Sequence, residues 1–166
     1  MESLKGFATL IRRNRRDILL IGVWTLAIAA VFIESHQQFY IDNPIMTYRQ
    51  IGFSEVRAPT TSPLDCMLIL FTSLVISVLL VSAKGLILGY AASLFLSSVI
   101  AVIYTFLFNW YVLNLGWAFS QLPFGWEWVI FQAIINTFRF IFPLAVTFSL
   151  IGVCIGSIVR MLTNRG

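Results

Sequence analysis

The sequence contains few charged residues for its length. They make up 11% of the 166 residues, whereas a soluble domain carries about 25% because charge covers its surface. Hydrophobic residues reach 59%, and the mean hydropathy is +0.90. A disordered chain is excluded, because disorder requires low hydrophobicity and high net charge. The composition predicts an integral membrane protein.

Histidine and cysteine are also scarce. His36 is the single histidine, which excludes a haem held by two histidines of this chain and any site that needs several imidazoles. Cys66 and Cys154 are the two cysteines, without a C-x-x-C motif. This excludes a disulfide-stapled secreted module and gives no support to thiol-oxidoreductase chemistry. We expect the two cysteines to lie at different membrane depths, too far apart for a disulfide.

The sequence also lacks the common catalytic motifs. It contains no P-loop, no GxSxG and no HExxH, so we expect a protein without catalytic activity or cofactor. Glu34, His36 and Asp65 are weak candidates for metal ligands at the outer face. Glu34 and His36 are two residues apart, whereas residues that share a helix face are three or four apart. We therefore expect no metal site, and a solvated His36 just past the end of a helix.

Four apolar stretches are present, and a membrane-crossing helix needs about 20 such residues. The predicted crossings are residues 18–33, 64–83, 86–108 and 140–161. The remaining parts are predicted as a cytoplasmic surface segment (1–16), an outer loop (34–62), an outer and interfacial segment (109–138) and a cytoplasmic tail (162–166). The predicted fold is a single all-α membrane domain of four transmembrane helices.

The interfacial segment is predicted because residues 126–161 form a stretch too long for one crossing. Arg139 and Pro143 interrupt this stretch, and we place the start of the last crossing at Phe140. Two further boundaries are indicated by local signals. Ser62-Pro63-Leu64-Asp65 resembles a helix start with a capping box. Lys84-Gly85 is so short a link that the second and third crossings are predicted to form an antiparallel hairpin.

The N-terminal segment combines apolar and basic residues. Its apolar residues recur at helical spacing, at Leu4, Phe7, Leu10 and Ile11. This pattern predicts an amphipathic helix on the inner leaflet. Its arginines are predicted to meet anionic lipid headgroups. They are Arg12, Arg13, Arg15 and Arg16.

The basic residues also predict orientation. Eight of the eleven lysines and arginines fall on the side of the N-terminus, the pattern of a cytoplasmic face. They are Lys5, Arg12, Arg13, Arg15, Arg16, Lys84, Arg160 and Arg165. We therefore predict a multi-pass protein of the cell membrane with both termini in the cytoplasm. Because these residues flank apolar stretches, nucleic-acid binding is not expected.

Small residues recur every fourth position in two of the predicted crossings, which is typical of closely packed membrane helices. They are Gly89, Ser93, Ser97 and Ala101 in the third crossing, and Gly152 and Gly156 in the fourth. Spacing alone leaves open whether these faces meet within the chain or on another subunit.

These features favour a non-catalytic structural or accessory subunit of a larger membrane complex, whose partners are other membrane subunits and anionic lipids. The alternative is a small transporter or channel component. Its polar path would be lined by Gln132, Asn136 and Arg139, which follow one another at helical spacing. Under the first hypothesis Arg139 reaches out to lipid headgroups. Under the second it is a counter-charge inside the membrane.

Overall fold

The fold is described from a computed structural model of the chain, over residues 2–42, 61–80, 82–112 and 125–163. Every element within these residues is helical, as predicted. The long helices are α1 (Glu2–Asp42), α2 (Pro63–Leu79), α3 (Ala83–Leu107), α5 (Gly125–Phe140) and α6 (Val146–Thr163). Two short π-helical segments, η2 (Phe108–Val112) and η3 (Ile141–Ala145), continue α3 and α5.

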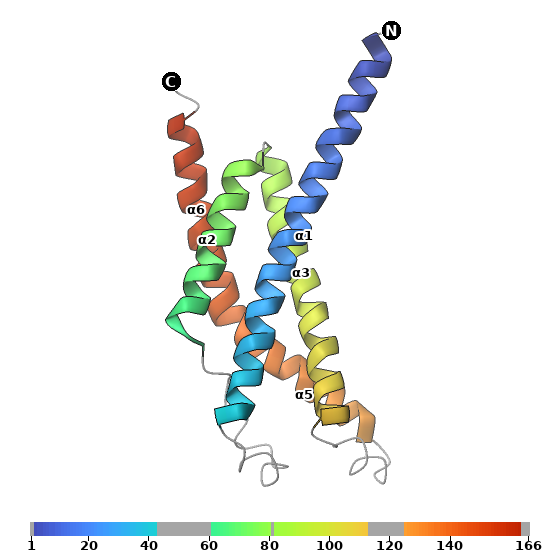
Figure 1. Cartoon of the computed structure of the whole chain (residues 1–166), viewed down its shortest axis with the longest axis vertical. Coiled ribbons are helices and arrows are strands. Elements are labelled where there is room, and N and C mark those ends of the chain that lie inside the picture. The colour runs from blue at the N-terminus through green and yellow to red at the C-terminus, as the bar shows by residue number, and fades with distance from the viewer. Residues whose placement is uncertain (1, 43–60, 81, 113–124, 164–166) are drawn as a thin grey trace.

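The helices form an elongated bundle (Figure 1). α1 begins and α6 ends at the end that also holds the turn between α2 and α3, here called the terminal end; the opposite end is the far end. α1 packs on both α2 and α3, α6 packs on α2, and α5 packs on α3. The chain therefore crosses the bundle at η3, from the α3 side to the α2 side.

Three helical stretches in the described residues are long and apolar enough to cross a membrane. They are Arg15–Phe39 with 25 residues, Ala83–Val112 with 30 and Val129–Thr163 with 35. α2 is a shorter apolar helix of 17 residues. The three long stretches are consistent with a multi-pass membrane protein.

The structure corrects the predicted limits of the first crossing. α1 is one helix from Glu2 to Asp42, so the surface segment 1–16 and the crossing 18–33 are not separate elements. The helix also continues past residue 34, where we predicted the outer loop. The reason is that Ser35 and His36 are buried in the bundle; the packing of their side chains extends the helix beyond its apolar stretch. The rest of the predicted loop, residues 43–60, lies outside the described residues.

The hairpin between α2 and α3 is confirmed, but its turn comes earlier than predicted. α2 ends at Leu79, and Ser82 caps α3 by accepting a hydrogen bond of 2.9 Å from the Gly85 backbone N–H. A serine hydroxyl at this position satisfies a backbone donor of the first turn. Lys84 and Gly85 therefore belong to α3. The predicted capping box at the start of α2 is also confirmed: Ser62 accepts from Leu64 N, and Asp65 accepts from Ser62 N.

The helix does not end where the last crossing was predicted to start. α5, η3 and α6 form a continuous helical stretch from Gly125 to Thr163 that includes Pro143. A proline removes one backbone donor and its ring crowds the preceding turn. The π-helical turn of η3 widens the helix at this point and accommodates the proline without ending the helix.

The contact between α2 and α6 depends on two glycines. A Cβ placed on Gly152 would collide with the Leu70 carbonyl oxygen and would lie 2.8 Å from the Ser73 Cβ. A Cβ on Gly156 would collide with the Ser77 hydroxyl and would lie 2.8 Å from the Leu74 carbonyl oxygen. The GxxxG motif therefore packs within the chain, where it brings the backbones of α2 and α6 together.

The small residues of α3 are also buried within the bundle. Gly89 lies against Ile21 of α1, where an added Cβ would come within 3.1 Å of the Ile21 side chain. Ser93, Ser97 and Ala101 are fully buried on the same face of α3. One polar contact ties α1 to α2 at mid-height: the Trp24 Nε1–H donates to the Ser73 hydroxyl at 2.9 Å.

Two arginines meet the end of α2 at the terminal end of the bundle. Arg160 of α6 donates from Nη1 to the Leu80 carbonyl oxygen at 2.7 Å, and Arg16 of α1 donates from Nη2 to the Leu79 carbonyl oxygen at 3.4 Å. The last carbonyl groups of a helix lack partners in the helix and carry partial negative charge. The two guanidinium groups therefore stabilise the end of α2 and connect it to α1 and α6.

A pair of glycine-to-alanine variants tests the α2–α6 contact. Gly152→Ala is expected to destabilise the protein by about 1–3 kcal/mol, because the added methyl group meets backbone atoms that cannot move aside. Gly22→Ala is the matched control, since nothing lies within 4 Å of its Cβ position. There we expect a gain of about 0.5–1 kcal/mol from helix propensity. Unfolding free energies in detergent micelles measure both; equal stabilities would contradict the packing described here.

Candidate functional site

The candidate metal ligands come from two helices, Glu34 and His36 from α1 and Asp65 from α2. Glu34 is exposed, whereas His36 and Asp65 are buried. Among these three described residues, Asp65 does not bond either of the other two candidates. Its Oδ2 accepts a hydrogen bond of 3.1 Å from the hydroxyl of Ser35, the residue between Glu34 and His36 in the sequence. The described residues contain no group of three histidine, cysteine or acidic side chains placed to share a metal ion.

The prediction of a solvated His36 is wrong. His36 is 3% exposed and lies in the interior of α1. Its ring stacks on Phe32 with centroids 5.8 Å apart, and it meets Tyr104 and Phe108 edge-on at 5.5 and 5.1 Å. The misleading signal was the polar run around it, which indicated a loop although the helix continues.

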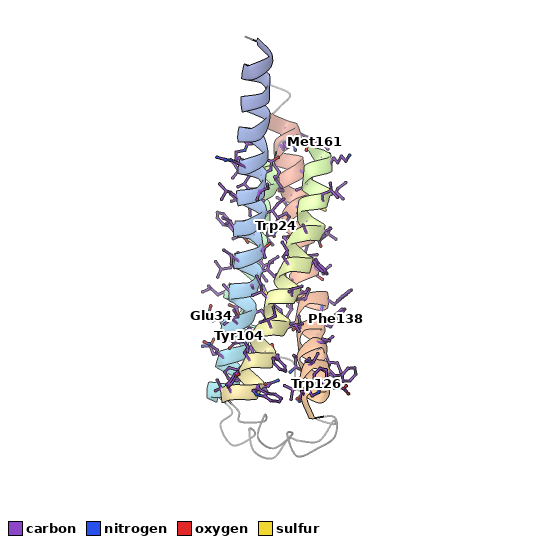
Figure 2. The ribbon with its side chains drawn as sticks, turned by 90° about the vertical axis from the view of Figure 1, so that its right-hand side faces the viewer. Trp24, Glu34, Tyr104, Trp126, Phe138 and Met161 are labelled. Atoms are coloured by element: carbon purple, nitrogen blue, oxygen red, sulfur yellow. The ribbon has the colours of Figure 1, made fainter. Side chains whose placement is uncertain are left out.

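The residues around His36 form an aromatic box between α1, α3 and α5, defined here as Phe32, His36, Tyr104, Phe108 and Phe140. Phe32 occupies its centre, with Phe140 edge-on at 5.1 Å and Tyr104 edge-on at 6.5 Å. Figure 2 shows Tyr104 at a level of the bundle similar to Glu34 and Phe138, between Trp24 and Trp126 and far from Met161. The box therefore lies in the far half of the bundle.

The predicted polar stripe on α5 does not present a common face. Asn136 is 7% exposed, Gln132 is half-buried and Arg139 is exposed. The stripe thus runs obliquely from the buried to the exposed side of α5, and Asn136 alone among the three is buried. Its neighbour Thr137, which the sequence analysis did not select, is fully buried as well.

Two further buried polar residues of α3 and η2 were also missed. Thr105 is fully buried and Asn109 is 2% exposed. The sequence did contain a signal for them. They continue the four-residue repeat of the small face of α3, which runs through Gly89, Ser93, Ser97, Ala101, Thr105 and Asn109. We refer to Thr105, Asn109, Asn136 and Thr137 together as the buried polar layer.

The four residues of this layer are buried on two helices, α3 with its continuation η2 and α5, that pack on each other. α3 is the main neighbour of α5, so the buried side chains of α5 face it. Phe140 contacts Phe32, and Phe32 contacts His36 one helical turn farther along α1. Since α5 runs in the opposite direction, Asn136 lies one turn from Phe140 toward the same end. The polar layer therefore adjoins the aromatic box.

The polar layer has unfilled hydrogen-bonding capacity. Four of its atoms are buried without a hydrogen-bond partner among the described residues. They are Thr105 Oγ1, Asn109 Oδ1, Asn136 Oδ1 and Thr137 Oγ1. Such atoms cost roughly 1–3 kcal/mol each when nothing satisfies them.

The electrostatics of the layer decide what it can hold. Of the charged side chains described, Asp65 is the buried one, and it faces Ser35 and Ser62. No charged side chain belongs to the polar layer or to the aromatic box. Moving an isolated ion into an apolar interior costs on the order of 20 kcal/mol in the idealised limit. The layer is therefore suited to neutral hydrogen-bonding groups and has no carboxylate with which to hold a metal ion.

Comparisons with protein families, with curated proteins and with solved structures found no match to this chain. The site is therefore interpreted from its own residues.

Two carboxylates at the far end provide a test of the Ser35–Asp65–Ser62 contact. Asp65→Ala removes the acceptor of a buried hydroxyl and of the capping backbone N–H. We expect a loss of about 2–3 kcal/mol of unfolding free energy. Glu34→Ala, at an exposed carboxylate next to Ser35, is expected to change it by less than about 0.5 kcal/mol. Chemical denaturation in micelles measures the difference, and similar effects of the two variants would contradict the assigned role of Asp65.

Proposed function

We propose that the chain is a four-crossing membrane protein that acts as a non-catalytic accessory subunit of a larger membrane complex. The crossings are the three long apolar stretches and α2. At 17 residues, α2 is about 26 Å long and reaches the lower limit for a crossing. Large apolar side chains are exposed on all five long helices, as expected for surfaces that face lipid or other membrane subunits.

The proposed orientation has the terminal end in the cytoplasm. Arg16, Lys84 and Arg160 lie at this end, and basic residues near the ends of crossings favour the cytoplasmic side. The N-terminal arginines then lie near anionic lipid headgroups. Two of these, Arg15 and Arg16, are exposed.

The orientation is tested with single cysteines at two exposed positions, Gln38 at the far end and Thr163 at the terminal end. The background carries Cys66→Ser and Cys154→Ala, because both native cysteines are free thiols. In intact cells we expect a membrane-impermeant maleimide to label Gln38→Cys, and to label Thr163→Cys only after permeabilisation. The reverse pattern would contradict the orientation, and equal labelling of both in intact cells would contradict the crossing.

The accessory role is supported by one observation, the projection of α1 beyond the α2–α3 hairpin (Figure 1). Arg16 contacts the end of α2, so the preceding residues of α1, from Glu2 to Asn14, extend about 20 Å past that hairpin. Leu4, Phe7, Leu10 and Ile11 recur at helical spacing in this part. A helix that leaves the bundle with such a stripe is suited to pack on a helix of another subunit.

The transport alternative has less support. It requires Gln132, Asn136 and Arg139 to line one path, but their exposures differ from buried to exposed around α5. The small-residue faces, which were left open as subunit contacts, are used within the chain by α2, α3 and α6. A subunit contact is therefore expected at the projecting part of α1.

Purification from native membranes in mild detergent tests the accessory role. We expect a partner to co-purify with the wild-type protein in a stoichiometric amount. In the double variant Phe7→Ser and Leu10→Ser, we expect the amount of co-purified partner to fall about tenfold or more, because each apolar side chain buried in the contact contributes about 1.5–3 kcal/mol. Glu2→Ser with Thr9→Ser is the matched control on the other side of the same segment. The accessory role is contradicted if the wild-type protein purifies alone and moves a solute when reconstituted by itself.

A further inference from the structure

We propose that α1, α3 and α5 enclose a binding site for a small neutral guest that forms hydrogen bonds. The guest is water or a solute that carries hydroxyl or amide groups. The site is the buried polar layer together with the adjoining aromatic box. It is independent of the accessory role, which rests on the projecting part of α1.

The hydroxyl groups of the layer differ from the other buried hydroxyl groups of the bundle. Among the described residues, each other buried serine and threonine has a hydrogen bond. Thr25, Ser73, Ser77, Ser93, Ser97 and Ser149 donate to a carbonyl oxygen three or four residues earlier, and Ser35 donates to Asp65. Thr105 and Thr137 are fully buried and lack this bond. Both belong to the polar layer, so the buried threonine hydroxyl groups without a hydrogen bond lie on the two helices that form it.

The amide groups of the layer reinforce this point. Asn109 and Asn136 are the buried asparagines of the described residues, and the side-chain oxygen of each lacks a donor. Buried polar side chains in proteins are almost always satisfied by protein or by ordered water. Four unsatisfied groups on two facing helices therefore indicate a bound molecule between them.

The backbone around the layer is irregular on both helices. η2 starts at Phe108, directly before Asn109, and η3 starts at Ile141, one turn beyond Thr137. π-helical turns widen a helix and occur frequently at functional sites. Both π-helical segments therefore adjoin residues of the polar layer in sequence.

The chemistry of the groups defines the guest. The amide oxygens require a donor, and each threonine hydroxyl donates or accepts. No charged side chain belongs to the layer or the box, so an ionic guest would be buried without a counter-charge. A neutral molecule with both donors and acceptors meets these requirements. The aromatic rings of Phe32, Phe108 and Phe140 close one side with apolar surface.

The sign of a stability change tests the proposal. Thr105→Val and Thr137→Val keep the shape of the side chain and remove the hydroxyl. If a guest is bound, each variant loses a bond to it, and we expect the melting temperature in micelles to fall by about 2–6 °C. Thr25→Val is the matched control, because that hydroxyl bonds the Ile21 carbonyl of its own helix; there we expect a shift below about 2 °C. A rise in both layer variants would show a dry layer and overturn the proposal.

Two measurements on the wild-type protein identify the guest and do not depend on any variant. Water-edited solid-state NMR detects magnetisation transfer from water to the side-chain amides of Asn109 and Asn136, and native mass spectrometry detects a bound solute. Transfer without an adduct identifies water. A stoichiometric adduct that is lost in Asn109→Leu identifies a solute. Absence of both signals overturns the proposal.

Discussion

The close contact between α2 and α6 determines where the second half of the chain lies. Gly152 and Gly156 let the backbone of α6 approach the backbone of α2, where any larger side chain would collide with Leu70 or Ser77. With α6 held beside α2, the bend at η3 directs α5 to the other side of the bundle, against α3. α1 packs on both α2 and α3, and its Trp24 donates a hydrogen bond to Ser73 on α2, the helix that also receives α6.

This arrangement divides the bundle into two unlike halves. Around α2 and α6, the buried hydroxyl groups bond to carbonyl oxygens of their own helix, and the end of α2 is bound by two arginines. The buried hydroxyl groups of these helices therefore need no partner from a neighbouring helix, and the helices pack through small residues. Between α3 and α5, the helices carry longer polar side chains and π-helical turns, and four polar atoms have no partner among the described residues. The first half packs through small residues, and the second contains the polar interior.

Sequence reasoning reached the helical class, the α2–α3 hairpin and the Ser62–Asp65 capping box, because each follows from local properties such as hydropathy, loop length and capping chemistry. Sequence reasoning failed where contacts between helices, and not local sequence, decide whether a helix continues. The polar run at Ser35 and His36 indicated a loop, although both side chains are buried against neighbouring helices. Pro143 indicated an interruption of the last apolar stretch, and a π-helical segment lies there without ending the helix. The spacing within α3 points to Thr105 and Asn109. Their placement against Asn136 and Thr137 depends on how α5 faces α3, and no spacing within one helix contains that information.

The arginine contacts at the end of α2 also bear on the order of assembly in the cell. Chains are synthesised from the N-terminus, and structure forms in the part already made. The contacts among α1, α2 and α3, including Trp24 to Ser73 and Arg16 to Leu79, involve residues made before α5. The Leu80 carbonyl receives Arg160 only after nearly the whole chain has been made. α1, α2 and α3 therefore form a template on which the last helix docks, and its docking completes the bonding at the end of a helix formed much earlier.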